Sequence, residues 1–390
     1  MRDRNLHATS KIDLLGTIRA RTAGETLSVL RPLLSGFGIT RVARVTGLDE
    51  IGIPTSICIR PNARHLATAQ GKGLTPELAD ISAIMESIEG YHAEIVPAPF
   101  DFASFRDTRK RGQTLDPRIL DSGPRWSTWS EDFPMRWVEG QELLSGESIS
   151  IPFVALTMDS SHPHPEFAIL RVSTNGLASG NNRVEAILHA MYELMERDAE
   201  FTWSCLGPDR RAATLVDSDT IDTPFLRDLL ARFRAARQLP IIWDITNHLQ
   251  VPAFRCVLVD QDPVRNLGRF HGSGAHLSKA VALSRALTEA AQARLTWISG
   301  TREDIFPSLY ADLSTHNYGP LLLPRARADF RNRQDPFSSI DLREDLDWVI
   351  SMLRSAGYSS IAVYHHTSES FPVSVVSVLI PGMRFSGNRI

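Results

Sequence analysis

Glu185, Glu193 and Glu196 recur in the segment Ser173–Arg197 at a spacing that gathers three carboxylates on one side of a helix. At about 100° per residue, Glu185 and Glu196 lie nearly in line, and Glu193 lies within one side-chain width of them. Three neighbouring carboxylates suit a divalent cation, which takes oxygen ligands. A solvated acidic face is the commoner interpretation of such a pattern when it stands alone.

A helix that begins after Asn182 would carry these glutamates. Asn182 is a preferred N-cap residue, and Glu185 three positions later completes a capping-box pattern. The polar, glycine-rich residues from Asn175 to Asn181 predict a loop before the helix. The apolar residues of the helix recur at helical spacing and form a separate stripe for burial: Val184, Ile187, Leu188, Met191, Leu194 and Met195.

Two more glutamates, Glu86 and Glu89, lie on a helix predicted from Pro76 to about Glu94, with Thr75 as its N-cap. Glu86 sits at the edge of the apolar stripe of this helix, and Glu89 falls almost within it. A carboxylate on a buried face needs a partner, which is either a cation or an Arg or Lys side chain. The preceding residues 71–73 (Gly-Lys-Gly) predict a turn whose backbone N–H groups could also face an anion.

A third helical stretch, Ser284–Arg294, places Arg285, Glu289 and Gln292 on one face. Alone, this row is typical of a salt-bridged surface. Arg294 points toward the apolar side, so it is either buried with a partner or at the helix edge.

Together the three stretches resemble the three ATP-binding motifs of the YcaO family. The residues that carry the resemblance are G-K-G with S-A-I-M-E-S-I-E, then N-G-L-A-S-G-N-N-R-V-E-A-I-L-H-A-M-Y-E-L-M-E-R, then A-L-T-E-A-A-Q-A-R. The motifs occur in family order. The phrase G-I-T-R-V-A-R-V-T-G-L-D-E-I-G-I-P at residues 38–54 is most similar to family members associated with TfuA-type partner proteins.

The resemblance implies that ATP and Mg²⁺ are the cofactors. It implies metal ligands at Glu86, Glu89, Glu185, Glu193 and Glu196. It implies nucleotide contacts at Arg19, Thr26, Lys72, Asn181, Arg285, Glu289, Gln292 and Arg294. Clustered glutamates raise one another's pKa unless cations are present, which agrees with this assignment. The first motif of the family often ends Glu-Arg, whereas Gly90 follows Glu89 here; no Walker P-loop pattern occurs.

Composition limits the other classes of function. The chain has 390 residues, 43% of them hydrophobic, and a formal net charge of −3 without a basic run, so nucleic-acid binding is not expected. The sequence has three widely spaced cysteines and no C-x-x-C pair, so neither a disulfide framework nor a zinc site is expected, and a cytoplasmic location is. For Cys205, a buried side chain is the commoner interpretation. No export signal or membrane-spanning run is seen, so no membrane partner is expected.

Alternating strand and helix patterns predict a mixed α/β or α+β fold. The resemblance implies a YcaO-type fold, with helices flanking the sheets and the ATP site between them. We expect residues 1–60 to form an N-terminal segment that contributes to the nucleotide site and residues 61–390 to form the catalytic core, the two together making one continuous domain. Residues 97–140 predict a long loop or a lid, which Trp126, Trp129 and Trp137 would anchor, and residues 268–274 predict a glycine-rich loop.

The family chemistry acts on a peptide or protein backbone: ATP phosphorylates an amide oxygen, and a nucleophile then displaces phosphate. Sulfide gives a thioamide, and a Cys, Ser or Thr side chain gives an azoline. The azoline-forming members commonly end in P-x-P-x-P, which is absent from the end of this sequence. We therefore expect thioamidation with a TfuA-like partner; azoline formation, a non-catalytic ATP-binding scaffold and a homodimer stay open.

Overall fold

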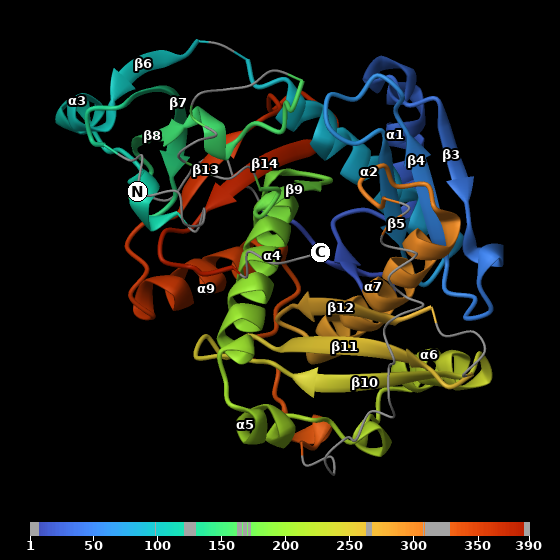
Figure 1. Ribbon diagram of the computed structural model, residues 1–390. Helices are drawn as coiled ribbons and strands as arrows, with labels where there is room; N and C mark the ends of the chain where they lie inside the picture. The colour runs from blue at the N-terminus through green and yellow to red at the C-terminus, as the bar shows by residue number, and fades with distance from the viewer. Residues whose placement is uncertain are drawn as a thin grey trace.

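The computed structural model describes residues 8–97, 99–120, 130–161, 166, 170, 173–262, 267–306, 308 and 328–385. Among the described residues, three antiparallel sheets of three or more strands surround a common centre with their helices. A long helix, α4 (Arg183–Ser204), runs from the upper sheet to the lower one (Figure 1). The fold is a mixed α/β fold, as predicted.

The first sheet has the order β3-β4-β5 (Arg41–Arg44, Thr55–Ile59, Thr68–Lys72). Helix α2 (Pro76–Glu94) covers it and contacts α1 (Ala23–Leu30). Thr75 caps α2 through a hydrogen bond from the Leu78 N–H, and Pro76 opens the helix, as predicted. Before α1, a short hairpin pairs β1 (Ile12–Asp13) with β2 (Ile18–Arg19).

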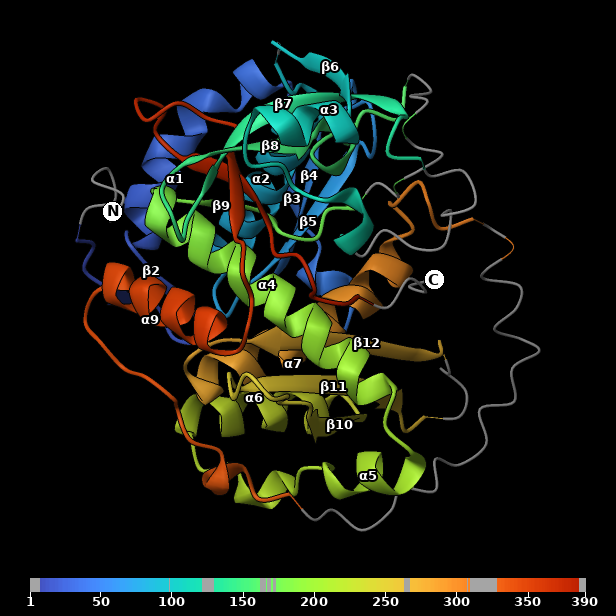
Figure 2. The same ribbon diagram turned by 90° about the vertical axis from the view of Figure 1, so that its left-hand side faces the viewer.

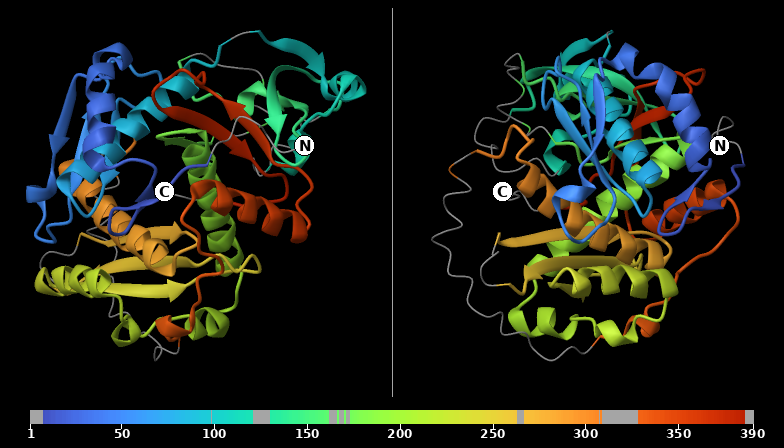
Figure 3. Two further views of the ribbon diagram at one scale, coloured as in Figure 1. Left: turned by 180° about the vertical axis from the view of Figure 1, so that it is seen from behind. Right: turned by 90° about the vertical axis from the view of Figure 1, so that its right-hand side faces the viewer.

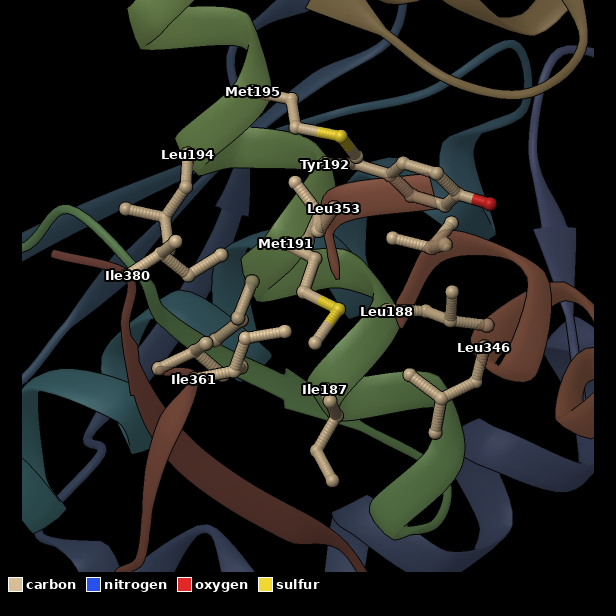
Figure 4. Packing of buried hydrophobic residues seen from close by; sticks show 14 of the residues in the cluster. Ile187, Leu188, Met191, Tyr192, Leu194, Met195, Leu346, Leu353, Ile361 and Ile380 are labelled. Atoms are coloured by element: carbon tan, nitrogen blue, oxygen red, sulfur yellow. The ribbon is translucent and has the colours of Figure 1, made fainter. Parts of the chain in front are cut away.

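The second sheet has the order β6-β7-β13-β14-β9, and β8 also pairs with β7. Its strands are Asp101–Ser104, Pro134–Glu142, Ala362–His365, Ser374–Leu379 and Leu177–Gly180, with β8 at Ser148–Pro152. Helices α4 and α9 (Leu342–Ser355) lie side by side below it (Figure 2). Between them is a core that includes Met191, Leu346, Leu353 and Ile361, each at most 1% exposed (Figure 4). The predicted apolar stripe of α4 is therefore buried.

The third sheet has the order β10-β11-β12 (Gln238–Asp244, Ala253–Asp260, Arg269–Ala275). Helix α7 (Lys279–Ser299) packs on β12 and β11, and α6 (Pro224–Ala235) packs on β10 (Figure 3). The short helices α3 (Phe105–Arg111) and α5 (Pro208–Ala213) lie outside these layers. Among the described residues, no helix combines the length and apolar character that crossing a bilayer requires.

Each sheet contributes one strand that leads into a long helix: β5 into α2, β9 into α4, and β12 into α7. The glycine-rich residues in these strands were predicted as loops or turns, and that prediction is wrong. A Cβ on Gly71 would lie 2.0 Å from the Ala83 backbone N, and one on Gly180 would lie 2.5 Å from the Ala186 backbone N. These glycines therefore mark close contact between a strand and its helix, rather than a turn.

The prediction of a structureless loop over residues 97–140 is also wrong, because this range contains β6, α3 and most of β7. Trp137 does anchor it, since its side chain is 1% exposed and its Nε1–H donates to the Ala103 carbonyl at 3.0 Å. Trp126 and Trp129 lie outside the described residues. No described residue of this range lines the central cavity, so the structure gives no support for a lid here.

Candidate functional site

A cavity of about 1860 Å³ lies where the three strand–helix units meet. Its wall includes all five glutamates predicted as metal ligands and seven of the eight residues predicted as nucleotide contacts: Glu86, Glu89, Glu185, Glu193, Glu196, Arg19, Thr26, Lys72, Asn181, Arg285, Glu289 and Gln292. These residues come from α2, from α4 and the connection before it, from α7, from β5 and from the N-terminal segment. Side chains that are far apart in the sequence thus face one space.

Helix α2 brings Glu86 and Glu89 to the cavity beside the free edges of two strands. Among the described residues, β5 pairs with β4 alone and β9 with β14 alone. The free edge of β9 presents the Ser179 N–H, which donates to Glu89 at 2.7 Å, and the Ser179 hydroxyl donates to the same oxygen at 2.5 Å. The backbone amide of Gln70 in β5 also interacts with Glu86 and lowers the pKa of its carboxyl. Unpaired edge amides therefore orient both carboxylates.

Burial, with a smaller contribution from neighbouring glutamates, raises the pKa of Glu86 to about 7 and that of Glu89 to about 8, although Lys72 and Arg302 act in the opposite direction on Glu86. The hydrogen bonds from Ser179 act in the opposite direction on Glu89 but do not overcome the burial. Near neutral pH, these side chains therefore share the space only if some are protonated or if cations are present.

Glu185 lies at the start of α4 and is 5% exposed. Half of the predicted capping box is present, because the Asn182 side chain accepts from the Glu185 N–H at 3.0 Å. The Glu185 carboxylate instead accepts from the Ala20 N–H at 2.8 Å and from the Asn181 amide at 3.1 Å. Arg19 is 3.7 Å away from Glu185. The N-terminal segment is thereby held against the cavity.

Thr26 is the second N-terminal residue predicted for the site, and it too is in the wall. Its hydroxyl donates to the Asn181 side-chain oxygen at 3.0 Å. Helix α1 is thus tied to the residues just before α4.

Glu193 and Glu196 lie further along α4 and share one guanidinium. Arg197 is 3.4 Å from Glu193, 3.1 Å from Glu196 and 3.6 Å from Glu200. Burial raises the pKa of Glu196 to about 7 although Arg197 lowers it. Glu200 is also held by Arg255 at 2.9 Å, which joins α4 to β11.

Helix α7 supplies the third group of side chains. Lys72 of β5 forms an ion pair with Glu289 at 3.2 Å, and the Gln292 amide donates to the Gln70 carbonyl at 3.1 Å. Arg285 approaches Glu196 at 3.9 Å. Arg285, Glu289 and Gln292, which taken alone were typical of a salt-bridged surface, are therefore part of the cavity wall.

Arg294, the eighth predicted nucleotide contact, does not line the cavity. Its guanidinium lies 3.1 Å from Asp49 and 3.3 Å from Asp260, and all three side chains are at most 5% exposed. Arg294 lies on the far side of α7 from Gln292, as expected for residues two positions apart on a helix. Its observed contacts are those of a buried ion pair that ties α7 to the first and third sheets.

The oxygen-rich wall fits a hard cation and an anionic ligand. No group of three or more His, Cys, Asp or Glu side chains forms a closed metal cage within the described part of the chain. The three α4 glutamates thus line one cavity without forming the single cation cradle that their spacing suggested. Mg²⁺ is usually held by one or two carboxylates with water and phosphate completing its shell, so an open arrangement suits it. Two residues of this wall also carry a buried polar atom without a hydrogen-bond partner in the described structure, Glu196 Oε2 and Arg285 Nε.

Several wall residues were not identified from the sequence. Ser179, His189, Arg197 and Arg302 all line the cavity. Two signals were available in the sequence: Arg197 ends the second motif beside two glutamates, and His189 lies four residues after Glu185 and four before Glu193 on the same helix face. The position of Ser179 depends on a strand edge that the sequence does not reveal. Cys205 is exposed rather than buried and lies outside the cavity wall.

Comparisons with known proteins agree with this arrangement. A family model for the YcaO cyclodehydratases, described as binding ATP and Mg²⁺, matches residues 70–384. A protein of Rhizobium leguminosarum bv. trifolii, described as uncharacterized and in the tfuA 3′ region, is 33% identical over 377 residues, which are 94% of this chain and 88% of that protein. An uncharacterized protein of Methanothermobacter thermautotrophicus is 33% identical over 370 residues, which are 92% and 93% of the two chains.

Two solved structures share the fold. A heterocyclase in complex with substrate and cofactor superimposes with a TM-score of 0.81 at 22% identity, covering 98% of this chain and 54% of that one. The YcaO protein from Methanopyrus kandleri, bound with AMPPCP and Mg²⁺, gives a TM-score of 0.74 at 22% identity, covering 96% and 95% of the two chains.

Proposed function

The chain belongs to the YcaO family, and on that premise we propose that it uses ATP and Mg²⁺ to convert a peptide backbone amide into a thioamide. The observation that supports this most is the convergence of Glu86, Glu89, Glu185, Glu193 and Glu196 on one cavity. The cationic side chains of the same wall, Arg19, Lys72 and Arg285, suit the phosphates of a nucleotide.

In this proposal the five glutamates hold Mg²⁺, which neutralises phosphate and carboxylate charge when it is bound. Thr26, Asn181 and Gln292 add neutral hydrogen-bonding groups beside the nucleotide. Glu289 stays ion-paired with Lys72 and orients it. Residues 1–60 and 61–390 act as one continuous domain, because the nucleotide site draws Arg19 and Thr26 from the N-terminal segment.

The reaction transfers the terminal phosphoryl group of ATP to the amide oxygen. Sulfide then forms a bond to the amide carbon, the carbon–oxygen bond breaks, and phosphate leaves with that oxygen. The products are a thioamide, ADP and phosphate. The wall contributes positioning and charge neutralisation, which supply most of the catalysis in phosphoryl transfer.

The choice of sulfide rests on the Rhizobium relative, which is described as lying in the tfuA 3′ region. A TfuA-like partner that delivers or generates sulfide would complete the system. Mass spectrometry of a candidate peptide after incubation with this protein, such a partner, ATP and sulfide tests the proposal. Replacement of one oxygen by sulfur supports it; loss of one water from the peptide would favour azoline formation instead. ATP binding without turnover in the complete mixture would favour a scaffold.

The raised pKa values predict that Mg-ATP binding releases protons. A carboxylate must be ionised before it can bind a cation, and Glu86 and Glu89 have pKa values of about 7 and about 8. The affinity for Mg-ATP should therefore rise with pH from 6 to 8, by up to about tenfold per pH unit for each proton released. Calorimetric titration at pH 7 in two buffers of different ionisation enthalpy measures the release. Identical heats in both buffers would contradict the prediction.

The raised pKa values of Glu86 and Glu89 also make the stability of the ligand-free protein depend on pH. The folded state retains protons on these carboxyls above pH 4.5, the usual value for Glu, where the unfolded state loses them. The free energy of unfolding without ligand should therefore fall as the pH rises from about 4.5 to about 8. Thermal unfolding should show that Mg-ATP stabilises the protein more at pH 8 than at pH 6.

Arg294→Lys should reduce the stability of the protein without changing its affinity for Mg-ATP. Lysine keeps the charge but cannot contact Asp49 and Asp260 with a rigid fork, so the free energy of unfolding should fall by about 2 kcal/mol. Urea unfolding measures this loss. Calorimetry should show unchanged Mg-ATP affinity, and a large loss of affinity would instead restore Arg294 as a nucleotide contact.

A further inference from the structure

His189 lies in the cavity wall, and the proposed function gives it no task. It projects from α4, and its two ring nitrogens face α7 and β9. Its Nε2 is 3.3 Å from the Arg285 Nη1 of α7, and its Nδ1 is 3.5 Å from the Ser179 carbonyl of β9. His189 thus bridges two of the three strand–helix units that converge on the cavity.

The chemistry of its neighbours sets the protonation of His189. An arginine can only donate hydrogen bonds, and a carbonyl can only accept them. The Nε2 atom therefore accepts from Arg285, and the Nδ1–H faces Ser179. Burial, together with the positive charges of Arg285, Arg19 and Lys72, holds the pKa of His189 well below its usual value. A neutral imidazole meets both requirements at once.

Arg285 has few other restraints. Its nearest carboxylate is Glu196, at 3.9 Å, and its Nε is buried without a hydrogen-bond partner in the described structure. A second carboxylate, Glu289, lies one turn further along α7 and is paired with Lys72. If the guanidinium turned fully toward such carboxylates, its charge would be cancelled and a metal ligand would be occupied. A neutral acceptor can orient a guanidinium without cancelling its charge.

We propose that His189 is a positioning residue that aims the Arg285 guanidinium into the cavity, at the phosphates of the bound nucleotide. This rests on the proposed function, which identifies that ligand as Mg-ATP. The role differs from structural packing because it acts only through Arg285.

Two substitutions by side-chain amides separate these roles. His189→Gln can place an amide oxygen where Nε2 accepts from Arg285. His189→Asn is too short to do so and keeps only the contact toward Ser179. Both are neutral and polar, so they serve as a matched pair. We expect the Gln variant to retain most of the wild-type affinity for Mg-ATP and the Asn variant to bind about tenfold more weakly, a change of about 1.4 kcal/mol, because it loses a hydrogen bond to a charged group.

The Mg-ATP affinities of His189→Gln and His189→Asn are then measured again in proteins that also carry Arg285→Met. If His189 acts through Arg285, the difference between Gln and Asn should disappear in this background. Equal affinities of the two variants with Arg285 present would overturn the proposal, as would a difference that persists with Met at position 285. Failure of the wild-type protein to bind Mg-ATP would instead refute the proposed function itself.

Discussion

Glu89→Gln is expected to lower the rate of ATP-dependent peptide modification about a thousandfold, because charge stabilisation by a metal is worth several kcal/mol in the transition state. No ion pair of Glu89 occurs among the described residues, although its charge acts on Arg19 from a distance, so its loss would leave no paired cation behind. The Gln carbonyl oxygen can still accept from the N–H and hydroxyl of Ser179. The substitution thus removes a charge while its hydrogen bonds remain. Rates of ADP formation and of peptide modification measure the effect.

The Glu89→Gln variant should be at least as stable as the wild type, although its rate of peptide modification falls. The raised pKa of Glu89 means that its ionised form is unfavourable in the folded protein without ligand. At pH 8 the ligand-free Gln variant should therefore unfold at a temperature equal to or above that of the wild type, and Mg-ATP should no longer raise it. A loss of activity caused only by misfolding would lower this temperature.

Glu77→Gln is the matched control on the same helix. Glu77 is half-exposed near the start of α2, 3.5 Å from Arg44, and it does not line the cavity. Surface ion pairs contribute at most about 1 kcal/mol, so activity and Mg-ATP affinity should stay at wild-type values. If both variants lost activity equally, the assignment of Glu89 would be wrong.

Gly71→Ala is expected to lower the free energy of unfolding by about 3 kcal/mol or more, because an added methyl group cannot be accommodated without movement of the backbone. Its Cβ would lie 2.0 Å from the Ala83 N and 2.3 Å from the Ala79 carbonyl, so β5 must separate from α2. This movement would also displace Lys72 and the edge amide that orients Glu86. Urea unfolding and Mg-ATP titration should therefore both show large losses.

Gly24→Ala is the control for this substitution. Gly24 lies in α1, and no atom lies within 4 Å of a Cβ added there. Alanine favours the helix by up to about 1 kcal/mol, so the same chemical change should stabilise the protein slightly. Wild-type stability of the Gly71 variant would show that β5 and α2 are not in the close contact described here.

The long helices of the site could be predicted because their signals are local. Thr75 with Pro76 and Asn182 with Glu185 are read within a few residues, and the predicted starts of α2 and α4 are confirmed. Helical spacing also placed the glutamates on shared faces. Local patterns could not give the direction in which those faces point, because this depends on contacts between distant residues, such as Glu89 with Ser179, 90 positions apart, and Lys72 with Glu289, 217 positions apart.

The errors have one physical origin. A glycine serves a turn and a close strand–helix contact equally well, so Gly71, Gly180 and Gly274 were assigned to loops or turns although they lie in strands. Because these strands were not predicted, their free edges could not be predicted either. The roles of the Gln70 and Ser179 backbone amides beside Glu86 and Glu89 were therefore missed. Arg294 illustrates a different limit. Its position in a motif could not show whether it contacts a ligand or forms a buried ion pair.

The most direct test of the account is a crystal structure with Mn²⁺ in place of Mg²⁺ and a non-hydrolysable ATP analogue, with the metal located by anomalous scattering. The account predicts metal peaks in the central cavity between α2 and α4, bound to carboxylates from among Glu86, Glu89, Glu185, Glu193 and Glu196. A nucleotide bound elsewhere, or a cavity that holds the nucleotide with no metal beside these glutamates, would contradict it.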